Sequence, residues 1–141
     1  MNATTLKLFA AVLLFALPML SQAQELHPID EQLNTCIETA PNNSELVGCA
    51  LTAYKQWDEV IDEEYKKLSN SLPDGLRAKL ENSQAAWIAY REHEFEFNND
   101  FFAGLNGTAW NVSSADWKMS FTRNRALELM TYNDILNGTE D

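Results

Sequence analysis

The feature that most constrains the fold is a long run of apolar residues spaced three and four positions apart. Its members are Leu46, Cys49, Ala50, Ala53, Trp57, Val60, Ile61, Tyr65 and Leu68. This spacing places side chains along one side of an α-helix. Pro41 ends any preceding helix, and Asn42 with Glu45 has the pattern of an N-cap with a capping box. We therefore predict one long helix from Asn42 to about Ser71.

The same criterion predicts two more long helices and a short one. The composition of Leu72-Pro73-Asp74-Gly75 indicates a turn that reverses the chain. Helices are then expected over residues 76–97 and 114–136, with a short helix over 29–40 at the start. Residues 98–113 are polar and contain glycine, so we expect an irregular loop there.

No alternation typical of strands stands out, so the predicted fold class is all-α. The expected architecture is a small antiparallel helical bundle. It consists of a long helical hairpin, a third long helix packed across it, and a short N-terminal helix joined to the hairpin by a disulfide.

Polar residues occupy positions that should face the interior. Along 76–97, the inward side carries Leu80, Gln84, Trp87, Ile88, Arg91 and Phe95, of which four are apolar. A buried guanidinium without a partner is costly, so Arg91 should meet a carboxylate of another helix or extend to solvent at the rim. Asp58 is the best-placed acid to meet Arg91, Arg125 or both, with Gln84 and Thr122 completing the hydrogen bonds.

Two interpretations of this polar set remain. Asp58 could be a catalytic acid, or the set could be a structural ion network that fixes how the helices align; Glu94 and Glu128 are secondary carboxylates. We favour the ion network, because structural ion pairs perturb pKa values just as catalytic groups do.

The charge of the chain narrows the classes of partner. Among 141 residues, 10 are Lys or Arg and 21 are Asp or Glu, for a formal net charge of -11. Such a chain has no basic stripe to neutralise phosphates, which argues against nucleic acid and against an anionic membrane surface. The acidic run over residues 58–64 could attract a cationic protein, or could simply be a solvated surface.

No catalytic, cofactor or metal site is expected. Arg91-Glu-His93-Glu94-Phe-Glu96 is not a His-Glu-x-x-His motif, because position 97 is Phe. His27 is the only other imidazole, and no phosphate-binding glycine loop occurs. A solvated acidic face explains this segment better than a metal centre.

The first residues have the pattern of a secretory signal peptide. Lys7 precedes an apolar run from Leu8 to Leu20, and Ser21-Gln22-Ala23 supplies small residues before a cleavage point. We predict a signal peptide over residues 1–23 and a single helical domain over 24–141. No cysteine lies near the cleavage point, so we expect a periplasmic or secreted protein without a lipid anchor and without membrane insertion after cleavage.

Two cysteines, Cys36 and Cys49, lie in the part expected to be exported. In an oxidising compartment they should pair. The alternative, a metal site of two thiols, is disfavoured because no histidines cluster with them. A bridge closing such a loop would stabilise the fold by about 3 kcal/mol in the chain-entropy model.

Together these positions resemble a known family, the lysozyme inhibitor LprI N-terminal domain family of small exported bacterial domains. The resemblance rests on Cys36; Asn42-x-x-Glu45-x-x-x-Cys49-Ala50; Tyr54-x-x-x-Asp58-x-x-Ile61-Asp62-x-x-Tyr65-x-x-Leu68; Leu76-Arg77; Gln84-x-x-Trp87-Ile88-x-Tyr90-Arg91-Glu92; and Thr122-x-x-Arg125-x-x-x-Leu129. It covers nearly all of the chain after the predicted signal peptide.

The chain also departs from the family pattern. Members often carry Asn where this chain has Asp62, and often carry a second cysteine pair. The matching positions here are Phe95 and Trp117, so the resemblance implies that an aromatic contact takes the place of that bridge.

The resemblance implies a non-enzymatic protein that binds and inhibits a lysozyme-type muramidase, and the acidic surface suits a cationic lysozyme. The candidate partner-binding residues are Phe101, Phe102 and Trp110, which are either exposed anchors or buried lids. Two other functions remain open: a periplasmic structural or envelope-stress module with another protein partner, and an immunity protein against a cell-wall hydrolase.

Overall fold

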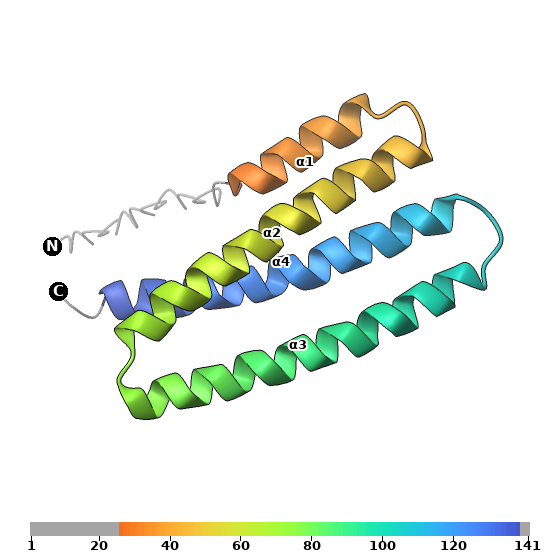
Figure 1. Ribbon diagram of the computed structural model, residues 1–141. Helices are drawn as coiled ribbons and strands as arrows, with labels where there is room; N and C mark the ends of the chain where they lie inside the picture. The colour runs from red at the N-terminus through yellow and green to blue at the C-terminus, as the bar shows by residue number, and fades with distance from the viewer. Residues whose placement is uncertain (1–25, 139–141) are drawn as a thin grey trace, which may run out of the picture.

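The structure is a computed structural model that describes residues 26–138, and four helices account for nearly all of them (Figure 1). Helix α1 spans Pro28–Thr39, α2 spans Asn43–Ser71, α3 spans Asp74–Ala103 and α4 spans Ala109–Gly138. Successive helices run in opposite directions, so α2 and α4 run the same way. The predicted all-α antiparallel bundle is confirmed. The signal peptide predicted for residues 1–23 lies outside the described residues.

Local sequence sets both ends of α2. The Asn42 side chain accepts a hydrogen bond from the Glu45 backbone N–H at 3.1 Å, which satisfies one of the unpaired amides of the first turn. At the other end, Arg77 donates to the backbone carbonyls of Ser69 and Leu72, each at 2.9 Å. A side chain of α3 thus satisfies carbonyls that the end of α2 leaves unpaired.

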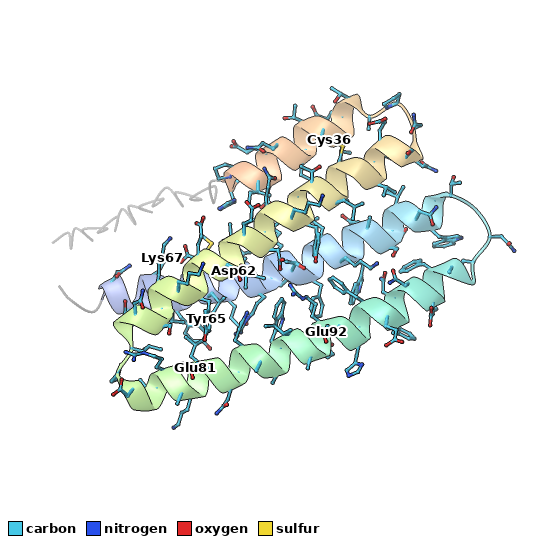
Figure 2. All side chains as sticks on the ribbon, in the orientation of Figure 1. Cys36, Asp62, Tyr65, Lys67, Glu81 and Glu92 are labelled. Atoms are coloured by element: carbon cyan, nitrogen blue, oxygen red, sulfur yellow. A yellow bond between two sulfur atoms is a disulfide. The ribbon has the colours of Figure 1, made fainter. Side chains whose placement is uncertain are left out.

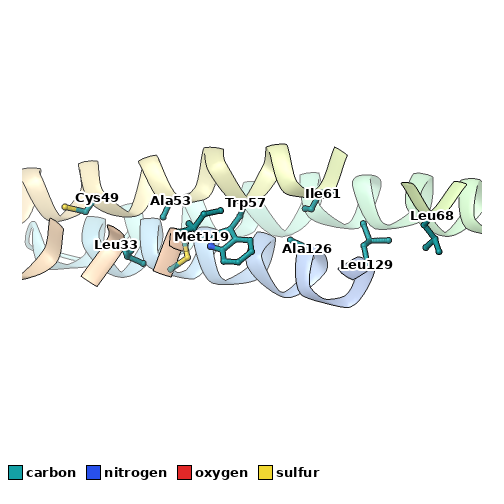
Figure 3. Packing of buried hydrophobic residues seen from close by; sticks show 10 residues of the cluster. Leu33, Cys49, Ala53, Trp57, Ile61, Leu68, Met119, Ala126 and Leu129 are labelled. Atoms are coloured by element: carbon teal, nitrogen blue, oxygen red, sulfur yellow. The ribbon is translucent and has the colours of Figure 1, made fainter. Parts of the chain in front are cut away.

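The apolar core lies where α1, α2 and α4 meet (Figure 3). Trp57 and Leu129 are fully buried in it, and Ile61 is nearly so. The buried cluster comprises Ile29, Leu33, Cys49, Ala53, Trp57, Ile61, Leu68, Met119, Ala126 and Leu129. Within the described chain, α3 contributes no member to this cluster. Helix α3 follows α2 in the chain, but the helix that packs most extensively against α2 is α4.

Helix α1 is attached to the bundle at two places. Cys36 and Cys49 form a disulfide with a Cα–Cα distance of 5.8 Å, as predicted. At the other end of α1, Arg123 of α4 donates to both carboxylate oxygens of Asp30 through Nε and Nη2. The Trp57 ring lies beneath this ion pair, 5.4 Å from the Arg123 guanidinium. These contacts fix a helix that is only 12 residues long.

The irregular loop predicted for residues 98–113 is wrong for most of its length. Helix α3 continues to Ala103 and α4 begins at Ala109, so only residues 104–108 connect them. The polar side chains that suggested a loop bind each other across the hairpin: the Ser114 hydroxyl donates to the Asn98 side-chain oxygen. The short turn is made by Gly107, whose φ of 113° favours glycine.

The inward side predicted for α3 is only partly correct. Leu80, Trp87 and Phe95 are half-buried against the core, but Ile88 is 37% exposed. The buried residues of α3 are Gln84 and Asn98, and both are polar. Helix α3 therefore lies on the bundle through polar and aromatic contacts rather than through an aliphatic seam.

Candidate functional site

The predicted polar set forms two separate contacts instead of one network. In the first, Arg91 Nη1 donates to Asp58 Oδ1 and links α3 to α2. The guanidinium also lies over the Trp87 ring, 4.7 Å from its centroid. The Asp58 side chain is 42% exposed. Asp58 thus meets Arg91, one of the pairings predicted from the sequence, and its carboxylate remains partly solvated.

In the second contact, Arg125 of α4 is only 6% exposed. Its Nε and Nη2 atoms donate to the Gln84 side-chain oxygen at 3.1 and 2.9 Å, and Nη1 donates to Glu128 at 2.7 Å. Glu128, and not Asp58, is thus the carboxylate partner of Arg125. The expectation for Thr122 is wrong: its hydroxyl is buried and makes no hydrogen bond within the described residues.

Aromatic rings fill the space between α3 and the rest of the bundle (Figure 2). Phe95 lies 5.9 Å from Tyr54 of α2 and 6.2 Å from Trp117 of α4, measured between ring centroids. Phe121 stacks on both Trp87 and Trp117, at 5.9 and 5.2 Å. The aromatic contact expected between Phe95 and Trp117 is present, and the two rings meet edge to face.

The candidate partner-binding residues lie at the turn between α3 and α4. Phe101 is 53% exposed and Trp110 is 42% exposed, whereas Phe102 is half-buried between them. The ring centroids are 5.2 Å apart for Phe101 and Phe102, and 6.3 Å apart for Phe102 and Trp110. Trp110 is held in place because its indole N–H donates to the Asn106 carbonyl at 3.1 Å. Phe101 and Trp110 are therefore not buried lids.

Two further exposed residues extend this surface and were missed by the sequence analysis. Phe97 is 65% exposed and packs on Phe101 with a centroid distance of 5.9 Å, and Leu105 is 37% exposed. Phe97 lies four residues before Phe101, which is the spacing of neighbours on a helix. A helix extended through residue 103 would have revealed this pair. We call the whole surface the tip patch: Phe97, Phe101, Phe102, Leu105 and Trp110.

The surroundings of the tip patch are acidic. Between residues 96 and 116 the chain has three acidic residues, Glu96, Asp100 and Asp116, and no basic residue. The nearest following cation in the sequence is Lys118, which donates to the Asn99 side chain and lies over the Phe95 ring. Partial burial lowers the pKa of Lys118. The patch thus combines exposed aromatic area with an acidic stretch of sequence, and Lys118 lines a pocket beside its residue Phe102.

Residues 26–138 contain no group of three or more His, Cys, Asp or Glu side chains placed to hold a metal ion. No helix in this range has both the length and the apolar character needed to cross a membrane. The tip patch is the candidate functional site because it groups exposed aromatic side chains at one end of the bundle.

Fold and site together define a helical domain with one disulfide and an exposed aromatic tip. Residues 36–129 match the family described as Lysozyme inhibitor LprI, and the chain belongs to this family. A crystal structure of an uncharacterized protein from Burkholderia thailandensis has the same fold, with a TM-score of 0.73 and 26% sequence identity. The alignment covers 78% of this chain but 55% of that protein, so this chain spans about half of its length. No curated protein matches the sequence.

Proposed function

We propose that this protein is exported and inhibits a lysozyme-type muramidase by binding it through the tip patch. The observation that carries the proposal is the exposure of Phe97, Phe101 and Trp110 at one end of the bundle, in a member of the Lysozyme inhibitor LprI family. Large aromatic side chains at the centre of an interface contribute most of the binding free energy in many complexes. A surface of this kind on a small helical domain supports a protein partner.

Charge supports a cationic target. The net charge of -11 and the absence of basic residues between Glu96 and Asp116 would accelerate association with a basic protein. The exposed acids Glu59, Asp62 and Glu63 on α2 add to this field, and Figure 2 shows Asp62 on that helix. Steering of this kind raises the association rate and is weakened by salt.

The shape of the tip supports occlusion of a cleft. Helices α3 and α4 have 30 residues each, so the hairpin is about 45 Å long at 1.5 Å per residue. It ends in a turn of only five residues, 104–108. We propose that this narrow end enters the substrate cleft of the muramidase and excludes the polysaccharide. The single domain over residues 24–141, the cleaved signal peptide and the periplasmic or secreted location belong to the same proposal.

The test is calorimetric titration of the oxidised protein against a cationic lysozyme at low and at physiological salt, with cell-wall hydrolysis followed in parallel. The expected result is saturable binding near one to one that persists at physiological salt and slows hydrolysis. A short chitin oligosaccharide, which occupies the substrate cleft, should compete with the inhibitor. Binding without competition would contradict the occlusion of the cleft.

The tip is tested by a matched pair of double variants. Phe101→Ala with Trp110→Ala removes two exposed anchors and should weaken binding at least 30-fold, on the order of 2 kcal/mol for hot-spot aromatics. Tyr132→Ala with Ile135→Ala removes two equally exposed side chains at the other end of α4 and should leave binding unchanged. Equal affinities for the two variants would refute the tip as the contact. Binding seen only at low salt would favour an envelope module with a different partner.

A further inference from the structure

A cavity of about 390 Å³ lies at the end of the bundle opposite to the tip patch. It opens where the end of α2, the start of α3 and the end of α4 meet, on the left in Figure 1. Most of its wall is aliphatic or aromatic: Leu68, Leu72, Leu76, Leu80, Tyr132 and Ile135. The volume falls within the range of sites that hold small organic ligands.

The charged groups of this cavity are mainly cationic, and Ser83 and Tyr132 add hydroxyl groups to its lining. Arg125 and Lys79 line it, and Glu128 is the one carboxylate among the lining residues. Arg125 is buried, and three of its five N–H groups donate to Gln84 and Glu128. Its other two N–H groups make no hydrogen bond with the described residues, and Lys79 forms no ion pair with them. Arg125 and Lys79 therefore bring two positively charged side chains to the wall of a half-open apolar pocket.

An apolar wall with cationic side chains suits an amphiphilic ligand that has an anionic head group. The lining has a net charge of +1 in a chain whose net charge is -11, so this site is electrostatically unlike the molecule as a whole. A second copy of the chain would bring the same -11 and would be repelled. A carboxylate can accept hydrogen bonds from arginine and lysine, and an aliphatic tail can pack among the leucines.

We propose that the cavity binds a single-chain aliphatic carboxylate, a fatty acid, with its tail among the leucines and its head between Arg125 and Lys79. The proposal is independent of muramidase inhibition, because the cavity and the tip patch lie at opposite ends of the hairpin. Either function can fail without affecting the other.

The experiment is calorimetric titration of the oxidised protein with saturated carboxylates of 8, 10 and 12 carbons, each below its micelle-forming concentration. Burial of the tail predicts that affinity rises about four-fold for each added methylene group. The methyl ester of each acid should bind at least ten-fold more weakly, since it cannot accept charge-assisted hydrogen bonds. Absence of binding at millimolar ligand, or equal affinity for all chain lengths, would overturn the proposal.

Two exposed positions locate the site without risk to the fold. Ile135→Asp places a negative charge in the wall and should weaken binding at least ten-fold, whereas Ile37→Asp, at an exposed site on α1 away from the cavity, should have no effect. Lys79→Ala should weaken binding of the acid but not of the ester. Equal binding by Ile135→Asp and Ile37→Asp, or loss of ester binding in Lys79→Ala, would contradict the assigned position of the ligand.

Discussion

The two long helices that pack against α2 do so in different ways. Helix α4 joins α2 and α1 around an aliphatic core with Trp57 fully buried at its centre. Helix α3 has only Gln84 and Asn98 buried, and contacts the bundle through aromatic rings and two arginine pairs. The same chain therefore contains one seam with most of the fully buried apolar residues and a second made mainly of polar and aromatic contacts.

The difference has a physical basis in what each contact contributes. Burial of aliphatic surface stabilises without regard to direction, at roughly 25 cal/mol per Å². A buried hydrogen bond adds little net free energy, but breaking it leaves an unpaired group that is costly. Polar contacts on α3 therefore specify where the hairpin lies, and with it where the tip patch points.

The largest expected effect is in the aliphatic core. Trp57→Ala should lower the free energy of unfolding by about 3–5 kcal/mol, because it leaves a large cavity at a site with no exposure. Trp87→Ala, on half-buried α3, should cost about 1–2 kcal/mol. Urea unfolding followed by circular dichroism measures both. Equal costs would remove the distinction between the two seams.

The second effect concerns α1. Replacement of both Cys36 and Cys49 by Ser should lower stability by about 3 kcal/mol, since the disulfide closes a loop with a sequence separation of 13. The ion pair of Asp30 with Arg123 remains and should keep α1 docked. Thermal unfolding in the presence and absence of reductant gives the comparison. A loss below about 1 kcal/mol would show that the ion pair and packing suffice.

The third effect tests the polar attachment of α3. Arg125→Met and Gln84→Leu should each cost about 2 kcal/mol, because each leaves a buried polar partner unsatisfied. The double variant should cost clearly less than the sum, since it removes both partners together. A double-mutant cycle on unfolding free energies measures this coupling. Additive costs, within about 0.5 kcal/mol, would contradict a direct role for the contact.

The smallest effect is at the turn of the hairpin. Gly107→Ala should cost about 1 kcal/mol, because its φ of 113° is strained for a residue with a Cβ. Gly75→Ala is the control, since it lies in the first turn of α3 and an added Cβ meets open space. In thermal unfolding, Gly107→Ala should lower the melting temperature more than Gly75→Ala. A neutral Gly107→Ala would mean that the turn adapts.

The sequence allowed the α2 helix, the disulfide and the fold class to be predicted, because periodic apolar residues and paired cysteines act locally. It predicted α3 less well. Ile88 shares the helical stripe of Trp87 but remains exposed, since only the spacing of the assembled helices decides which edge of a stripe is covered. The polar residues around Asn98 suggested a loop, yet they pair across the hairpin with Ser114. Such a hydrogen bond forms only when the two helices pack together, so the composition of the segment cannot predict it.

The most direct test of the two-seam account is native-state hydrogen exchange, measured by mass spectrometry along the chain. Amides in the middle of α2 and α4 should exchange only through global unfolding. Amides of α3 between residues 80 and 95 should open at a lower free energy, because α3 contributes no member to the buried aliphatic cluster and covers it only with half-buried side chains such as Leu80 and Trp87. Protection of α3 equal to that of α2 and α4 would contradict the account.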